Sequence, residues 1–139
     1  MNNARIESTC PISFTLDLFG DKWTLLIMRD ILFRQKRSFS EFLNSSEKIA
    51  SNILVDRLNL LVKEDLIIKG TSPENKSKFL YRPTQKGIDL FPLLCEMVLW
   101  ADRYSPKGAD KTLTKPLMAD RPKTISQLKK PFEQQLNQS

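Results

Sequence analysis

The spacing of the apolar residues changes along this chain, and the change limits the possible folds more than any other sequence feature. Over residues 22–33 the apolar side chains recur at the period of one helix face. Two short segments rich in β-forming residues, 66–69 and 79–82, then enclose a turn-forming stretch at 71–78. A helical pattern returns over residues 85–104. These periods predict a mainly α fold with one small β-hairpin (α+β).

Capping and breaking residues place the helices of the first half. Pro11 and Gly20 suit the start and the end of a first helix, and Asp21 can cap the next one. Residues 38–41, Ser-Phe-Ser-Glu, have the S-x-x-E pattern of a capping box, and a polar turn follows at 45–48. The expected helices cover residues 12–19, 22–33, 39–44 and 50–64. A short helix, a turn and a longer helix, followed directly by a hairpin, predict a winged helix-turn-helix.

The second half adds an apolar helix and a basic extension. Pro92 lies inside the expected helix 85–104 and predicts a kink, and the helix is apolar enough that we expect a second subunit to cover it. Residues 1–104 therefore form the expected winged-helix domain, and residues 105–139 form a basic, proline-containing extension. Apolar residues recur there at helical spacing, but Pro131 interrupts them. We expect either a flexible tail or a helix that docks on a partner subunit.

Composition argues against catalysis. Histidine is absent and the chain has only two cysteines, Cys10 and Cys95, which removes the usual acid–base and nucleophile arrangements and the commonest zinc ligand. The four glycines form no phosphate-binding loop. We therefore expect no enzyme activity, no metal and no cofactor. No apolar run is long enough for a membrane helix, and residues 1–9 lack a signal-peptide core, so we expect a cytoplasmic protein without a membrane partner.

The order and spacing of several short motifs resemble those of the HxlR-type regulators. Cys10-Pro11 leads into residues 20–23, Gly-Asp-Lys-Trp, as that family's CP pair leads into a G-x-K-W helix, and residues 39–42 resemble its F-S-E-L. Later segments that resemble the family are residues 49–61, Tyr81 with Thr84 and Gly87, and Pro92 with Trp100. The resemblance covers about residues 10–104. It implies a winged helix, a homodimer joined through the first and last helices, and transcriptional regulation by binding an operator in double-stranded DNA.

Several positions depart from the family's pattern. Ala50 replaces a frequent serine at the start of the recognition helix, so we expect Ser51 to take the cap one residue later. Asn52 and Asn59 stand where basic residues are frequent, which predicts a different operator sequence. Asp65 replaces a usual glycine, and a left-handed turn there is less favourable for aspartate.

The expected recognition helix presents a polar face that can read bases. Recognition helices of this class place their N-terminal residues against base edges in the major groove. The candidate reading residues are Ser51, Asn52, Val55, Asp56 and Asn59. Asn52 suits adenine, Val55 suits the thymine methyl group, and Asp56 either accepts from a cytosine amino group or pairs with a nearby arginine. The alternative is that this face is only solvated.

Further residues are candidates for contacts with the DNA backbone. They flank the helix-turn-helix or lie in the hairpin, and they are Arg37, Ser38, Lys76, Lys78 and Arg82. Cationic and hydroxyl side chains there can bind phosphates and fix the orientation on the duplex. Because a two-fold dimer presents two identical helices, we expect an inverted repeat with half-sites about one or two helical turns apart.

Cys10 is the candidate sensing residue. It precedes a helix that begins at Pro11, and unpaired N–H groups at a helix start stabilise a thiolate. Members of the resembling family use a cysteine here to sense oxidants or electrophiles, so we hypothesise that modification of Cys10 releases DNA. The alternative is a cysteine that only packs, as we expect for Cys95. Two other functions stay open: a regulator with a ligand cavity in the dimer, and a protein-interaction module.

Overall fold

The computed structural model describes residues 9–138, so the polar segment 1–8, in which we expected no signal peptide, lies outside the described residues. The described chain folds into two compact units. The first contains residues 9–64 and 69–82, and the second contains residues 65–68 and 83–138. Residues 105–138 are therefore not a unit of their own, because they belong to the same unit as the helices that precede them.

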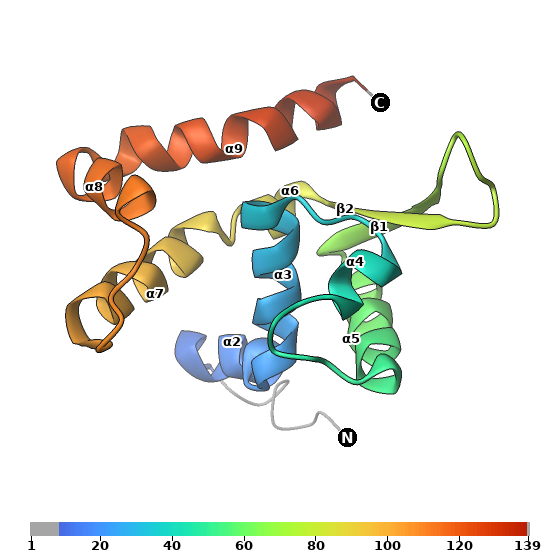
Figure 1. Ribbon diagram of the computed structural model, residues 1–139, viewed down its shortest axis with the longest axis horizontal. Coiled ribbons are helices and arrows are strands. Elements are labelled where there is room, and N and C mark those ends of the chain that lie inside the picture. The colour runs from blue at the N-terminus through green and yellow to red at the C-terminus, as the bar shows by residue number, and fades with distance from the viewer. Residues whose placement is uncertain (1–8, 139) are drawn as a thin grey trace. The chain divides into compact units, whose positions relative to one another are not determined.

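The first unit contains the helix-turn-helix (Figure 1). Its helices are α2 (Pro11–Phe19), α3 (Lys22–Arg34), α4 (Phe39–Leu43) and α5 (Ser51–Lys63). α3 packs against α2 and α5, and α4 packs against α5. Five residues of the apolar faces predicted from the periodicity are confirmed as buried, and they are Ile27, Ile31, Leu54, Leu58 and Leu61. Burying such a side chain contributes roughly 1.5–3 kcal/mol relative to leaving it exposed. The prediction that Val62 also lies on the buried face of α5 is wrong, because its side chain is exposed.

The helix caps explain where these helices begin. The Asp21 carboxylate accepts hydrogen bonds from the backbone N–H groups of Trp23 and Thr24 and so caps α3. The predicted capping box is present at the start of α4, between Ser38 and Glu41. The expectation that Ser51 caps α5 is wrong, because Ala50 holds the N-cap position without a side-chain hydrogen bond.

The predicted hairpin is also present. Strands β1 (Ile67–Thr71) and β2 (Phe79–Pro83) pair with each other, and the loop between them closes with a hydrogen bond from the Ser72 N–H to the Lys78 carbonyl at 2.8 Å. The base of the hairpin contacts the α4 region, since the Tyr81 N–H donates to the Arg37 carbonyl at 2.8 Å. The ring centroids of Tyr81 and Phe42 lie 6.2 Å apart. These contacts give the winged-helix arrangement expected from the sequence.

The second unit differs from the expectation at Pro92. Instead of one kinked helix over residues 85–104, the chain forms α6 (Gln85–Ile88) and α7 (Phe91–Tyr104). Pro92 lies in the first turn of α7, where a helix needs no N–H donor, so the proline starts a helix and does not kink one. The Thr84 hydroxyl caps α6 by accepting from the Gly87 N–H at 3.1 Å.

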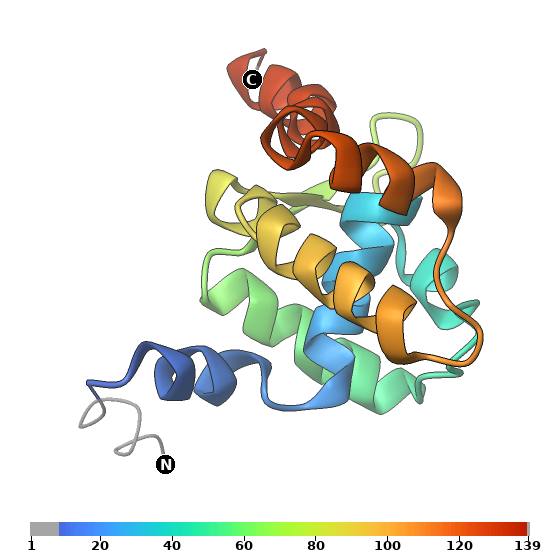
Figure 2. The ribbon, with the colours of Figure 1, turned by 90° about the vertical axis from the view of Figure 1, so that its left-hand side faces the viewer.

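The extension is helical and folds back on its own chain. It forms α8 (Lys111–Ala119) and α9 (Arg121–Asn137), and α9 packs against α6, α7 and α8 (Figure 2). Pro131 does not end the helix, because α9 continues through it. The rings of Phe132 and Phe91 lie 5.8 Å apart between centroids, and both side chains are buried. None of the helices within residues 9–138 is long and apolar enough to cross a membrane.

Candidate nucleic-acid interface

One face of α5 is exposed and carries all the side chains that we predicted to read DNA. Leu54, Leu58 and Leu61 point into the core, and the opposite face is accessible. The exposed residues on that face are Ser51, Asn52, Val55, Asp56 and Asn59. Four of them follow the spacing i, i+3, i+4, i+7, which aligns their side chains along one side of a helix. The apolar Val55 side chain, 47% exposed, lies among these polar neighbours.

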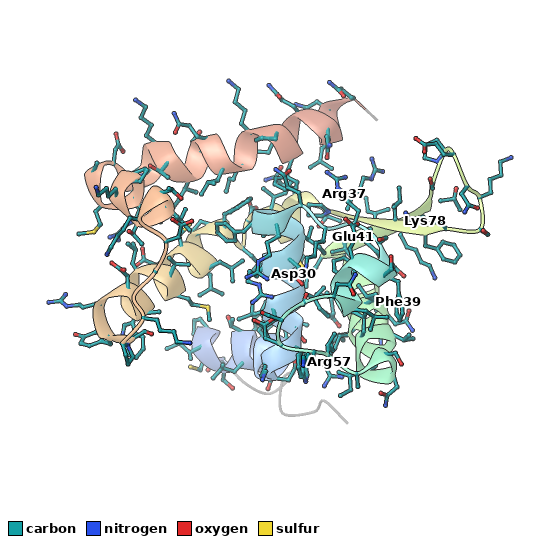
Figure 3. All side chains as sticks on the ribbon, viewed as in Figure 1. Asp30, Arg37, Phe39, Glu41, Arg57 and Lys78 are labelled. Atoms are coloured by element: carbon teal, nitrogen blue, oxygen red, sulfur yellow. The ribbon has the colours of Figure 1, made fainter. Side chains whose placement is uncertain are left out.

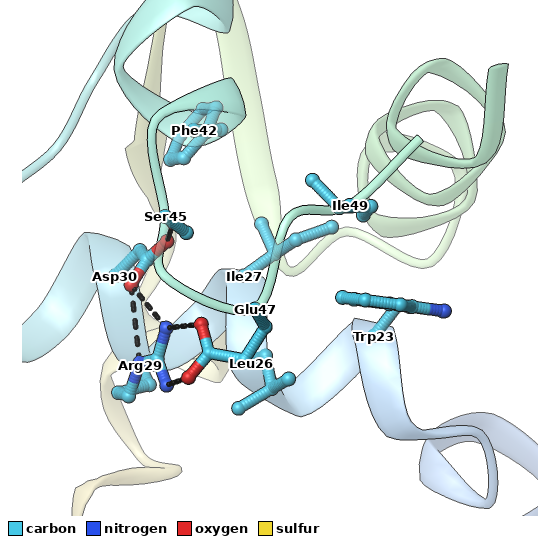
Figure 4. Close-up of a pocket in the computed structure, with 9 residues that line it drawn as sticks. All are labelled: Trp23, Leu26, Ile27, Arg29, Asp30, Phe42, Ser45, Glu47 and Ile49. Atoms are coloured by element: carbon cyan, nitrogen blue, oxygen red, sulfur yellow. Dashed lines mark hydrogen bonds and ion pairs between the residues drawn. The ribbon is translucent and has the colours of Figure 1, made fainter. Parts of the chain in front are cut away.

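The turn before α5 is held by a polar network that the sequence did not reveal. The Arg29 guanidinium donates to both carboxylate oxygens of Glu47, at 2.8 and 2.9 Å, and to Asp30 Oδ1. Asp30 is buried and also accepts a hydrogen bond from the Ser45 hydroxyl. Lys36 Nζ donates to Ser45 Oγ at 2.9 Å. Figure 4 shows Arg29 and Asp30 on α3 facing Ser45 and Glu47 of the turn. The charged side chains that attach this turn to α3 are therefore Arg29, Asp30, Lys36 and Glu47.

This network changes the titration of its members. Hydrogen bonds from Arg29 lower the pKa of Glu47 to about 2, and the bonds to Glu47 raise the pKa of Arg29. The cavity that these residues line measures only about 10 Å³, which is room for one water molecule and not for a ligand. The network is therefore a support for the turn and not a binding pocket.

A second polar cluster joins the start of α3 to α5. Arg57 Nε donates to Asp21 Oδ2 at 2.8 Å, and Arg57 Nη1 donates to the neighbouring Asp56 carboxylate. Burial raises the pKa of Asp21, but the hydrogen bonds from Arg57 and Thr24 outweigh it and leave the pKa below its usual value. Of the two roles that we considered for Asp56, the structure shows the pairing with an arginine.

The candidate backbone contacts do not share one environment. Lys76, Lys78 and Arg82 are exposed, and Arg37 is half-buried beside α4 (Figure 3). The prediction that Ser38 contacts the DNA backbone must be corrected, because its side chain is buried and its hydroxyl belongs to the capping box with Glu41. The Ser38 hydroxyl is thus occupied inside the protein and is removed from the candidate set.

The two cysteines have opposite surroundings. Cys10 is exposed and is the N-cap residue of α2, with Pro11 in the first turn. Cys95 is buried on α7, and burial raises the pKa of its thiol to about 11. Cys95 is therefore a protonated core residue near neutral pH. Within residues 9–138 no group of three or more histidine, cysteine, aspartate or glutamate side chains is placed to hold a metal ion.

Exposed apolar side chains gather on two helices, each in its own unit. On α2 they are Ile12, Phe14 and Leu16, with 71%, 54% and 57% of the side chain exposed. On α7 they are Leu93, Met97, Trp100 and Tyr104. Large apolar patches on a soluble protein usually mark a surface that another molecule covers.

Comparison with known proteins agrees with this description. The family model for HxlR-like helix-turn-helix proteins matches residues 18–109. The HTH-type transcriptional regulator YodB of Bacillus subtilis is 30% identical over 103 residues, which cover 73% of this chain and 91% of YodB.

Solved structures show the same similarity. PA1607, described as a candidate transcription factor, is 35% identical with a TM-score of 0.68 over 78% of this chain and 75% of its own. Reduced YodB is 27% identical with a TM-score of 0.58 over 73% of this chain and 99% of its own, and YodB has also been solved after diamide treatment and with a quinone bound.

The family match begins near the end of α2 and stops before α8, so it covers the helix-turn-helix, the hairpin and α7. The relatives are described as transcriptional regulators or transcription factors, and the matching family is one of helix-turn-helix proteins. The chain therefore belongs to the HxlR-like helix-turn-helix family of DNA-binding transcriptional regulators.

Proposed function

We propose that this regulator binds an inverted-repeat operator as a homodimer and reads it with the exposed face of α5. The observation that carries the proposal is that Ser51, Asn52, Val55, Asp56 and Asn59 all lie exposed on α5, behind a turn attached to α3 by the Arg29–Glu47 ion pair. Asn52 can bond adenine through its amide, and Val55 can contact a thymine methyl group. A supported turn matters because base contacts require a fixed helix orientation.

The candidate basic residues have the role of backbone contacts in this proposal. Lys76 and Lys78 lie in or beside the hairpin loop, Arg82 lies on β2, and Arg37 precedes α4. Exposed cations on such elements bind phosphates through charge and carry no sequence information themselves. They set the orientation of the protein on the duplex, and α5 supplies the specificity.

The exposed apolar side chains of α2 and α7 support the homodimer. A second copy of the chain would cover both helices and remove Ile12 and Trp100, the two most exposed apolar side chains on them, from water. Each copy would then present one α5, which is why an inverted repeat is the expected operator.

Cys10 is the sensing residue in this proposal. Its exposed position at the start of α2 makes it accessible to an oxidant or electrophile, whereas Cys95 is buried. The related YodB has been solved both after diamide treatment and with a quinone bound, which supports a thiol-based response in the family. Modification at Cys10 would change a helix that we place at the dimer interface and so weaken operator binding.

Selection of duplexes from a random pool tests the DNA-binding proposal. We expect an inverted repeat, bound by a dimer in sedimentation equilibrium, with an affinity that falls as salt rises. Absence of salt-dependent duplex binding would reject the proposal and favour a protein-interaction module. A selected site without two-fold symmetry would reject binding as a two-fold dimer.

Diamide treatment tests the sensing residue. We expect diamide to release the selected duplex from the unmodified protein and from Cys95→Ser, but not from Cys10→Ser. Equal release from the Cys10→Ser variant would remove Cys10 from the mechanism. A rise in melting temperature with an added small molecule, in the absence of any thiol effect, would favour the alternative of a ligand-responsive regulator.

A further inference from the structure

Arg57 bonds to two carboxylates at once, and one of them faces solvent on the reading side of α5. It reaches Asp21 through Nε and Asp56 through Nη1. We propose that Asp21 and Arg57 are positioning residues that orient the Asp56 carboxylate to accept a hydrogen bond from a cytosine amino group. The proposal rests on the proposed reading role of α5. It adds that the Asp56 carboxylate selects one base and that Arg57 and Asp21 hold this carboxylate in place.

Asp21 is a firm anchor for this chain of contacts. Its carboxylate caps α3 through the N–H groups of Trp23 and Thr24, and it also accepts from the Thr24 hydroxyl at 2.6 Å. The preceding backbone is tightly packed, because a Cβ atom at Gly20 would lie 2.4 Å from the Leu16 carbonyl oxygen. The three hydrogen bonds to its carboxylate hold the Asp21 side chain at the start of α3.

Arg57 transfers this anchoring to Asp56. The guanidinium group is planar and its donors have fixed directions, so the bond to Asp21 also sets the direction of the donor that reaches Asp56. The Asp56 side chain is 69% exposed, so without Arg57 it would sample several rotamers in water. Exposed ion pairs contribute little to stability, and we assign this one to orientation.

A fixed carboxylate has a defined preference among bases. It only accepts hydrogen bonds, so it matches the cytosine amino group, which has no acceptor beside it on the same base in the major groove. It opposes the acceptor atoms of guanine and thymine, and also the N7 acceptor that lies beside the adenine amino group. It also repels phosphates, and the charge of Arg57 offsets that repulsion. Asp56 occupies the first half of α5, on the same side as Asn52, where recognition helices meet base edges.

The test begins by comparing the duplexes that the wild type and Asp56→Asn select from one random pool. Asparagine has the amide pattern that suits adenine, so we expect one position to change from cytosine to adenine. Competition binding with the wild-type duplex and the same duplex altered at that position then measures discrimination for Asp21→Ser, Arg57→Lys and the double variant. Serine caps a helix as well as aspartate but is too short to reach Arg57. Lysine keeps the charge of Arg57 but lacks its planar fork of donors, so it does not fix the directions of two bonds at once.

We expect discrimination at that position to fall about fivefold in each single variant, and the double variant to lose no more than either one, because all of them break the same connection. Glu133→Ser removes one negative charge on α9, which is neither the reading helix nor a helix of the proposed dimer, and should keep wild-type discrimination. Melting temperatures identify any variant that fails to fold, and the remaining variants then decide. Unchanged selection by Asp56→Asn, unchanged discrimination in folded Asp21→Ser and Arg57→Lys, or effects that multiply in the double variant would each overturn the proposal. If the wild type selects no duplex, the proposed function fails as well.

Discussion

Within the helix-turn-helix of α3 to α5, the turn is attached by charged side chains, and the buried Asp30 carboxylate is at the centre of that network. Within α6 to α9, the extension is attached mainly by apolar contact, with Phe132 against Phe91. The ion pairs of the second unit, such as Lys129 with Asp89, lie at its surface. The two regions thus use different chemistry for attachment.

The difference follows from what each region has to fix. Hydrogen-bonded charges have preferred directions, so they can set the angle of a short turn that contains few apolar residues. Apolar contact is non-directional, and it suits the attachment of long helices such as α9. Among the described residues no buried side-chain nitrogen or oxygen lacks a hydrogen-bond partner, so the polar network is fully satisfied.

The largest expected effect comes from removing the centre of the polar network. Asp30→Ala leaves Arg29 and Lys36 without their buried partner, and we expect the free energy of unfolding to fall by about 4 kcal/mol. Asp89→Ala removes an exposed ion pair in the second unit and should cost less than about 1 kcal/mol. Urea denaturation of both variants measures the difference. Equal losses would contradict the contrast between the two regions.

The corresponding prediction for the second unit concerns the apolar contact between Phe132 and Phe91. Phe132→Ala empties a buried site beside Phe91, and we expect a loss of about 3 kcal/mol. Hydrogen exchange should accelerate in α7 and α9 more than in α3. Gln134→Ala, at an exposed position of α9, is the control, and its free energy of unfolding and hydrogen exchange should stay close to those of the wild type. Uniform acceleration through both units would show that they unfold together.

Acid should weaken the ion pair between Arg29 and Glu47 in the polar network. The folded pKa of Glu47, about 2, lies below its unfolded value of 4.5, so the ion pair with Arg29 stabilises the fold above pH 4.5. That contribution is lost as the pH falls from 4.5 towards 2. Because Glu47 is partly exposed, we expect a loss of about 1 kcal/mol. Glu47→Gln should lack this part of the pH dependence in urea titrations at pH 6 and pH 3. An identical pH dependence in the variant would contradict the assignment.

Salt dependence of DNA binding compares the hairpin with α9. If Lys76 of each copy in the proposed dimer contacts a phosphate, Lys76→Ala should reduce the slope of log affinity against log salt by about 0.9 per contact, or about 1.8 per dimer, for every sequence tested. Lys123 is an exposed cation on α9, and Lys123→Ala should leave the slope unchanged. Titrations by fluorescence anisotropy at several salt concentrations measure both. A reduced slope for Lys123→Ala alone would move the backbone contact to the extension.

The smallest effect is expected between α5 and β1. Asp65 has φ 62°, a left-handed conformation that glycine adopts without strain. We expect Asp65→Gly to raise the free energy of unfolding by about 0.5 kcal/mol. Glu64 has φ −85°, so Glu64→Gly should instead destabilise the protein. A loss of stability in Asp65→Gly would show that the aspartate side chain contributes more than the relief of strain.

The sequence by itself determined the elements whose signals are local. The Asp21 cap and the Ser38–Glu41 capping box depend on hydrogen bonds between residues two or three positions apart, and each predicted a helix start correctly. The periodicity of α3 and α5 likewise identified their buried faces, and with these faces it identified the exposed face proposed to read DNA. Helix starts and buried faces are visible in sequence because each depends on the spacing of neighbouring residues.

Only the tertiary structure decided the contacts between distant segments. Arg29 and Glu47 are 18 positions apart and Asp21 and Arg57 are 36 apart, so no local pattern links them. The attachment of α9 through Phe132 likewise depends on how the helices of the second unit pack. Such pairs form because packing brings positions that are far apart in the sequence together, and the charge or apolarity of one residue does not identify its partner.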